Sequence, residues 1–173
     1  MSSVKKTSIK HIKYLTSRFA FPTFLALFSI QAQATSSCSQ LYEQKDFNAA
    51  VQQCTEDAKH NLPSADFILG NLYENGYGVE KNTNKALSFY RRALLNNNVD
   101  SQIALGKYHT KNKNYLPSYV YFSLAVSNGS LNALLLQDKI AKNLTAQEIE
   151  QSNELLELLN NAIANERQQV AAN

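Results

Sequence analysis

The chain has 173 residues, with 17 basic and 14 acidic side chains and a formal net charge of +3. Five of the bases and none of the acids lie in residues 1–34, so the rest of the chain carries 12 bases and 14 acids. Because nucleic-acid binding needs a basic face, this balance gives no reason to expect a nucleic-acid partner. The 139 residues after Ala34 are enough for one domain.

The first 34 residues have the pattern of a secretory signal peptide. A basic head is followed by an uncharged apolar run, Phe19 to Ile30, and by the small-residue motif Ala32-Gln33-Ala34. The run is shorter than the roughly 20 residues that span a bilayer. We therefore predict cleavage after Ala34, export, and no stable membrane insertion of the mature chain. The periplasm is the favoured destination, and secretion is the alternative. The basic residues of the head are Lys5, Lys6, Lys10, Lys13 and Arg18.

Apolar residues then recur three and four positions apart, which is the period of an amphipathic helix. No stretch alternates apolar and polar residues as a half-buried strand would, so we predict an all-α fold of antiparallel helix pairs. Ser64 is a predicted N-cap. The spacing of Thr145 and Glu148 predicts a capping box that opens a last helix ending near Gln168. In chain order we expect a hairpin at 36–60, a repeat at 64–97, a degenerate repeat at 98–131 and closing helices at 132–168.

Cys38 and Cys54 are the only cysteines, and they lie on either side of the turn expected near Lys45 and Asp46. In an antiparallel helix pair they would sit at about the same height. An even pair in an exported chain is typical of a structural disulfide. The closed loop would stabilise the fold by roughly 3 kcal/mol. A reactive or metal-binding pair is the alternative, although the spacing is not C-x-x-C and only His60 lies close in sequence.

An internal repeat occupies residues 64–131. Ala65–Tyr73 aligns with Ser101–His109 at an offset of 36, and Ala86–Ala93 aligns with Ser118–Ala125 at an offset of 32. A glycine inside a helix costs about 1 kcal/mol relative to alanine. The aligned Gly70 and Gly106 therefore predict close helix contacts, for which Ala93 and Ala125 are the expected partners. The predicted packing residues are Leu69, Gly70, Tyr73, Gly76, Gly78, Ala86, Tyr90, Ala93, Leu105, Gly106 and Ala125.

Residues 64–97 resemble a Sel-one-like repeat, a short helix–turn–helix relative of the tetratricopeptide repeat. The resemblance rests on Leu69-Gly70, Gly76-x-Gly78 and Phe89-Tyr90. It is weaker in residues 98–131, where the glycine loop is replaced. It implies an α/α superhelix (a solenoid) of stacked helix pairs, whose first helices line a concave binding surface.

The resemblance also implies that the partner is another protein or peptide. Polar residues that flank the packing positions of the first helices are the candidates for this contact, with an ordinary solvated surface as the alternative interpretation. These candidate binding residues are Asp66, Asn71, Gln102 and Lys107.

Catalysis is not expected. His60 and His109, the histidines of the mature chain, have no nucleophile motif beside them, and His109 aligns with the packing residue Tyr73. The glycine loop at 76–79 lacks the Gly-Lys-Ser/Thr end of a phosphate loop. We therefore expect no cofactor and no metal. The alternative, implied by cysteine-rich exported relatives, is β-lactam binding or hydrolysis. Those relatives carry a cysteine pair in successive repeats, whereas this chain has one pair.

Overall fold

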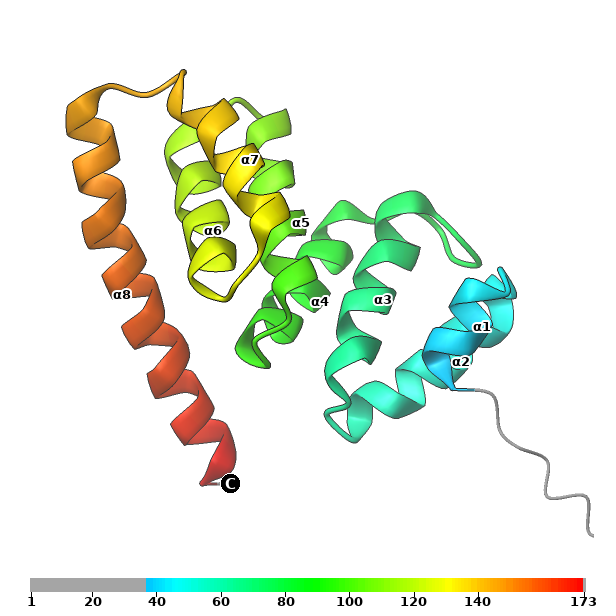
Figure 1. The fold of residues 1–173 in the computed structure, drawn as a ribbon. Helices are drawn as coiled ribbons and strands as arrows, with labels where there is room; N and C mark the ends of the chain where they lie inside the picture. Colours follow the sequence, from blue (N-terminus) through cyan, green and yellow to red (C-terminus); the bar gives the residue numbers. More distant parts are fainter. Residues whose placement is uncertain (1–36, 173) are drawn as a thin grey trace, which may run out of the picture. The chain divides into compact units, whose positions relative to one another are not determined.

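The computed structural model describes residues 37–172, and the predicted signal peptide lies outside this range. Within it the chain forms helices and no strand, which confirms the predicted all-α fold (Figure 1). The helices are α1 (Cys38–Glu43), α2 (Phe47–Lys59), α3 (Pro63–Asn75), α4 (Thr83–Leu95), α5 (Val99–Lys111), α6 (Tyr115–Ser127), α7 (Leu131–Ala141) and α8 (Ala146–Ala171).

Helices that follow one another in the chain pack as pairs: α1 with α2, α3 with α4, and α5 with α6. Each pair also packs on the next through its neighbouring helices, α2 on α3 and α4 on α5. The last two helices close this stack, because α7 packs on α6 and the long α8 returns along α6 as far as α4 (Figure 1). The result is the predicted solenoid of stacked antiparallel helix pairs.

Side-chain caps set where most of the helices begin. The predicted capping box is present, because Thr145 accepts a hydrogen bond from the backbone N–H of Glu148, whose side chain bonds back to Thr145. The prediction for Ser64 is wrong, since the N-cap of α3 is Leu62, two residues earlier, and Pro63 lies in the first turn. Proline suits this position because its missing N–H is not needed there. The last helix extends to Ala171, beyond the expected end near Gln168.

The two glycines inside the first helices of the repeats do allow close contacts, and the nearest atoms belong to aromatic rings rather than to the alanines we expected. A Cβ added to Gly70 would lie 2.4 Å from Cε1 of Tyr90, and one added to Gly106 would lie 2.6 Å from Cε1 of Phe122. Tyr90 and Phe122 are themselves related by the offset of 32 residues. The ring of the second helix therefore lies directly on the backbone of the first, in both repeats.

A second ring contact also occurs in both repeats. Tyr73 stacks on Phe89 with ring centroids 5.6 Å apart and planes inclined by 14°. The aligned pair, His109 and Tyr121, stacks at 5.4 Å and the same angle. His109 therefore takes the place of a packing tyrosine.

The glycine loop joins the first repeat to the N-terminal pair. Gly76 ends α3 in the left-handed conformation, with φ of 76°. Gly78 has φ of 67°, and a Cβ on it would lie 2.7 Å from the carbonyl oxygen of Phe47. Between them, Tyr77 stacks on the Phe47 ring at 4.5 Å. Only glycine combines this backbone conformation with so close an approach.

A disulfide joins Cys38 to Cys54, with the two Cα atoms 4.7 Å apart. Both side chains are buried beside Ala50 and Leu69 in the N-terminal part of the core. Asp57 adds a second link, because its Oδ2 accepts a hydrogen bond from the backbone N–H of Cys38 at 3.3 Å. These contacts hold α1 on α2 at the end of the stack.

Candidate functional site

The first helices of successive pairs share a hollow, which we call the first-helix groove. Its volume is about 210 Å³, and α3, α5 and the start of α7 contribute to it. The lining residues are Phe67, Asn71, Glu74, Asp100, Ile103, Ala104, Lys107 and Asn132. Apolar side chains and polar groups of both charges line it together, so it can contact a polypeptide segment through side chains and backbone.

Two of the four candidate binding residues lie in this groove and two do not. Asn71 and Lys107 line it. Asp66 and Gln102 are buried, with only 2% and 1% of their surface exposed, which corrects the expectation that they are surface positions. Their side chains have partners inside the protein: Asp66 faces Arg92, and Gln102 accepts a hydrogen bond from Asn128.

The polar residues of the groove are positioned from the core. The hydroxyl of the buried Tyr90 lies 2.5 Å from Oε2 of Glu74, to which it donates, and 2.8 Å from Oδ1 of Asn71. Burial of the ring and the Glu74 carboxylate together raise the pKa of Tyr90. The hydroxyl therefore keeps its proton and remains a hydrogen-bond donor. Tyr90 thus packs on Gly70 with its ring and orders two groove residues with its hydroxyl.

Sequence reasoning did not select Glu74 for the groove. Its position three residues after Asn71, on the same face of the helix, is the signal that could have found it.

Lysines gather at one end of the groove. Lys107 and Lys111 line a second hollow with Lys139, above an apolar floor of Phe122 and Ile140. The same two lysines line a third hollow with Lys81 and Glu74. This end therefore favours negatively charged groups on a bound segment.

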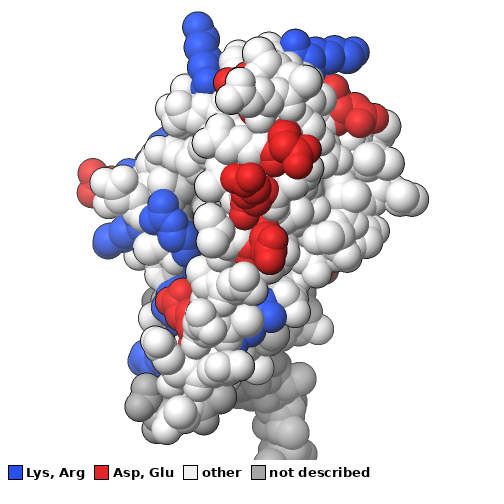
Figure 2. Space-filling model, turned by 90° about the vertical axis from the view of Figure 1, so that its left-hand side faces the viewer, with Lys and Arg blue, Asp and Glu red and all other residues white. Residues whose placement is uncertain are grey.

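Acidic side chains, by contrast, form a row on the face that contains α8 (Figure 2). This helix carries Glu148, Glu150, Glu154 and Glu157. The pKa of Glu148 is lowered by the hydrogen bond from the backbone N–H of Thr145, as expected for an N-terminal carboxylate. The acidic row therefore belongs to a different helix from Lys107 and Lys111 of α5.

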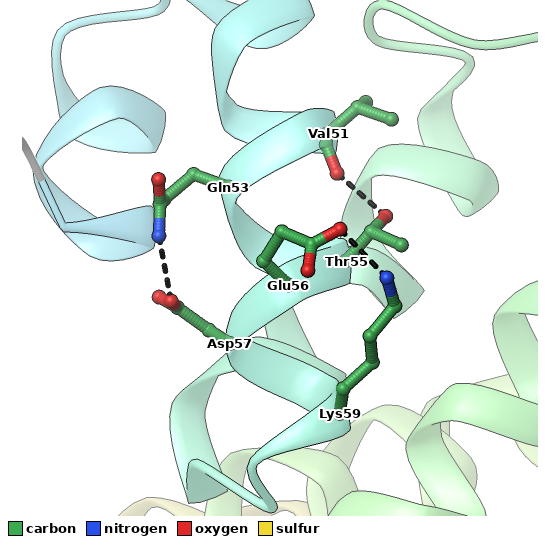
Figure 3. Close-up of polar contacts among 6 residues, drawn as sticks. All are labelled: Val51, Gln53, Thr55, Glu56, Asp57 and Lys59. Atoms are coloured by element: carbon green, nitrogen blue, oxygen red, sulfur yellow. Dashed lines mark hydrogen bonds and ion pairs between the residues drawn. The ribbon is translucent and has the colours of Figure 1, made fainter.

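Another hollow, with a volume of about 810 Å³, is lined by Leu41 of α1 and by residues of α2. The polar groups drawn in Figure 3 are bonded to each other along the helix. Gln53 donates to Asp57, Thr55 donates to the Val51 carbonyl, and Lys59 pairs with Glu56, each at 2.7 Å. Because these groups already bond within one helix, this surface is a weaker candidate than the first-helix groove.

His60 and His109, the histidines of the part of the chain that the structure describes, do not line these hollows. His60 is exposed at the end of α2. The pKa of His109 is lowered, first by burial and then by the nearby Arg91 charge, so the ring is neutral at neutral pH. Within residues 37–172, His, Cys, Asp and Glu side chains do not gather in the groups of three or more that could hold a metal ion. In the same range no helix is both long and apolar enough to cross a membrane.

The fold and the groove define a helical-repeat scaffold. Neither a protein-family model nor a curated protein matches the chain, but solved structures do. One is a protective antigen present in uropathogenic Escherichia coli strains, which displays a Sel1-like repeat fold. It is 22% identical with a TM-score of 0.68, over 75% of this chain and 30% of the antigen. Another is a Sel1 repeat protein from Oxalobacter formigenes, 25% identical with a TM-score of 0.55, over 58% of this chain and 43% of that protein.

Both neighbours have Sel-one-like repeats, so the predicted resemblance to this family and its fold is confirmed. The chain spans less than half the length of either structure.

Proposed function

We propose that this protein is an exported, non-catalytic scaffold that holds a segment of another protein in its first-helix groove, within the cell envelope or outside the cell. The observation that carries the proposal is the groove itself. Residues from three first helices line one hollow, and a core tyrosine orders two of its polar side chains. A surface assembled across successive repeats suits an extended partner.

Two features support export. Residues 1–34 carry the basic head, apolar run and small-residue motif of a signal peptide. The mature part has its cysteines joined in a disulfide, which is usual in oxidising compartments and rare in the cytosol. We propose cleavage after Ala34, with a helical-repeat domain at 35–173. The intact mass of the exported protein should equal that of residues 35–173 less two hydrogens. A retained N-terminus or two free thiols would contradict this part of the proposal.

Affinity capture from envelope extracts, followed by mass spectrometry, tests the binding role. The bait is the mature protein, compared with an Asn71→Ala/Lys107→Ala double variant and with Lys142→Ala. Lys142 is exposed at the end of α7 and does not line the described hollows, so it serves as the matched control. We expect a partner that wild type and Lys142→Ala retain and the double variant loses. Equal retention by all three baits would place binding elsewhere and contradict the proposal.

A further inference from the structure

Helix α7 turns a stripe of apolar side chains toward solvent. Leu131 and Leu135 lie about one turn apart and are 80% and 70% exposed, and Lys139, a further turn along, is exposed as well. The other side of the helix packs on α6 and buries Ala133 and Ile140. Neighbouring leucines this exposed are typical of a contact surface. We call the stripe of Leu131, Leu135 and Lys139 the α7 face.

Helix α8 carries an exposed stripe with the same spacing and the opposite charge. Glu150, Glu154 and Leu158 recur every four residues, and Leu158 is 63% exposed. These glutamates belong to the acidic row on the face that contains α8 (Figure 2), and residues 146–166 include no lysine or arginine. We call the stripe of Glu150, Glu154 and Leu158 the α8 face.

The two faces match each other when their helices run antiparallel. Each consists of three positions four residues apart, which follow one side of a helix over about two turns. In the antiparallel register Leu131 lies opposite Leu158 and Lys139 lies opposite Glu150, with the middle positions between them. In the parallel register Leu131 would face Glu150, and Lys139 would face Leu158. Apolar contact and charge therefore favour the same orientation.

The positive charge at the α7 face is reinforced from α5. Lys139 lines a hollow together with Lys107 and Lys111, whereas Asp138 is the one acidic residue of α7. Among residues 37–172, Lys139 makes no ion pair, and neither does Glu150. The charges of both faces are thus available to a partner of opposite charge.

The faces do not cover each other within one chain, because Leu131 and Leu158 both remain exposed. The helices α7 and α8 each pack on α6. Every copy of the chain therefore carries both faces open. A dimer with twofold symmetry forms the contact between them twice and leaves neither face uncovered.

We propose that a second copy of this chain covers these surfaces, with the α7 face of each copy packed antiparallel on the α8 face of the other. The dimer buries the exposed leucines and places Lys139 beside Glu150. Neither face includes a residue that lines the first-helix groove, so this self-association does not depend on the protein-binding role.

Sedimentation equilibrium of the mature protein tests the proposal. We expect a reversible equilibrium between monomer and dimer. Lys139→Glu and Glu150→Lys should each weaken the dimer about tenfold, and the double variant should return to within about threefold of wild type because it restores opposite charges. Lys81→Glu, the same charge reversal at an exposed lysine outside both faces, is the control and should leave the dissociation constant unchanged.

Leu131→Gln tests the apolar part of the contact. It should weaken the dimer about tenfold or more. Because this leucine is 80% exposed in the single chain, its replacement should leave the circular dichroism spectrum unchanged.

A wild-type chain that stays monomeric up to ~1 mM would overturn the proposal, as would assemblies that grow beyond the dimer. A dimer that Leu131→Gln leaves intact, or a double variant no tighter than the single ones, would place self-association elsewhere and overturn it as well. All these measurements use the purified chain alone, so a failure to capture a partner is a separate result.

Discussion

The two repeats share their apolar contacts and differ in their polar ones. In each, a ring of the second helix lies on a glycine of the first, and a second ring pair stacks beside it. The polar groups around these contacts diverge. The hydroxyl of Tyr90 bonds to two residues that line the groove, whereas the aligned Phe122 has no hydroxyl. The shared contacts therefore build the scaffold, and the differences between the repeats mark where binding sites can arise.

The largest expected effect comes from filling the ring-on-glycine contact. Gly70→Val and Gly106→Val should each destabilise the protein by about 2 kcal/mol, because a Cβ would overlap the Tyr90 or Phe122 ring. Urea unfolding followed by circular dichroism measures both. Lys107→Val, at the exposed residue beside Gly106, is the control and should cost about 0.5 kcal/mol. A large loss for only one glycine would break the equivalence of the repeats.

A smaller effect should follow from making the first repeat resemble the second. Tyr90→Phe keeps the ring on Gly70 and removes the hydroxyl that bonds to Glu74 and Asn71. We expect a loss of about 1 kcal/mol in unfolding free energy, together with weaker partner binding. Glu74→Gln retains an acceptor for this hydroxyl and should lose less stability. Unchanged stability in Tyr90→Phe would mean that the hydroxyl does not order the groove.

The smallest effect concerns pH. Burial and Arg91 lower the pKa of His109, so the unfolded chain binds a proton more readily than the folded one. The contribution of the neutral ring to the free energy of unfolding is complete above pH 6.5, the ordinary pKa of histidine. It is lost as the pH falls from 6.5 through the lowered pKa of His109 in the folded protein. His109→Tyr copies Tyr73 of the first repeat and removes this titration. Thermal melts between about pH 7 and about pH 5 should therefore show wild type losing stability relative to the variant. Parallel pH profiles would contradict this.

The sequence predicted the elements and the close approach of helices, because glycines, caps and apolar periodicity act over a few residues. It missed which side chains fill that approach, since Ala93 and Tyr90 lie about one turn apart on the same helix and a glycine leaves room for either. The prediction that Asp66 and Gln102 lie at the surface is wrong because it rests only on the polarity of their side chains. No local sequence pattern indicates that α8 returns along the stack, because Arg167 fixes it on carbonyls some 70 positions away in the chain.

Site-specific photo-crosslinking in cells most directly tests the claim that the first helices carry the binding surface. A photoreactive residue at position 107 lies in the first-helix groove, and one at Ser88 lies on the exposed side of the second helix α4. We predict a discrete crosslinked partner from position 107 and none from position 88. Crosslinks of equal yield at both positions, or from position 88 alone, would contradict the account.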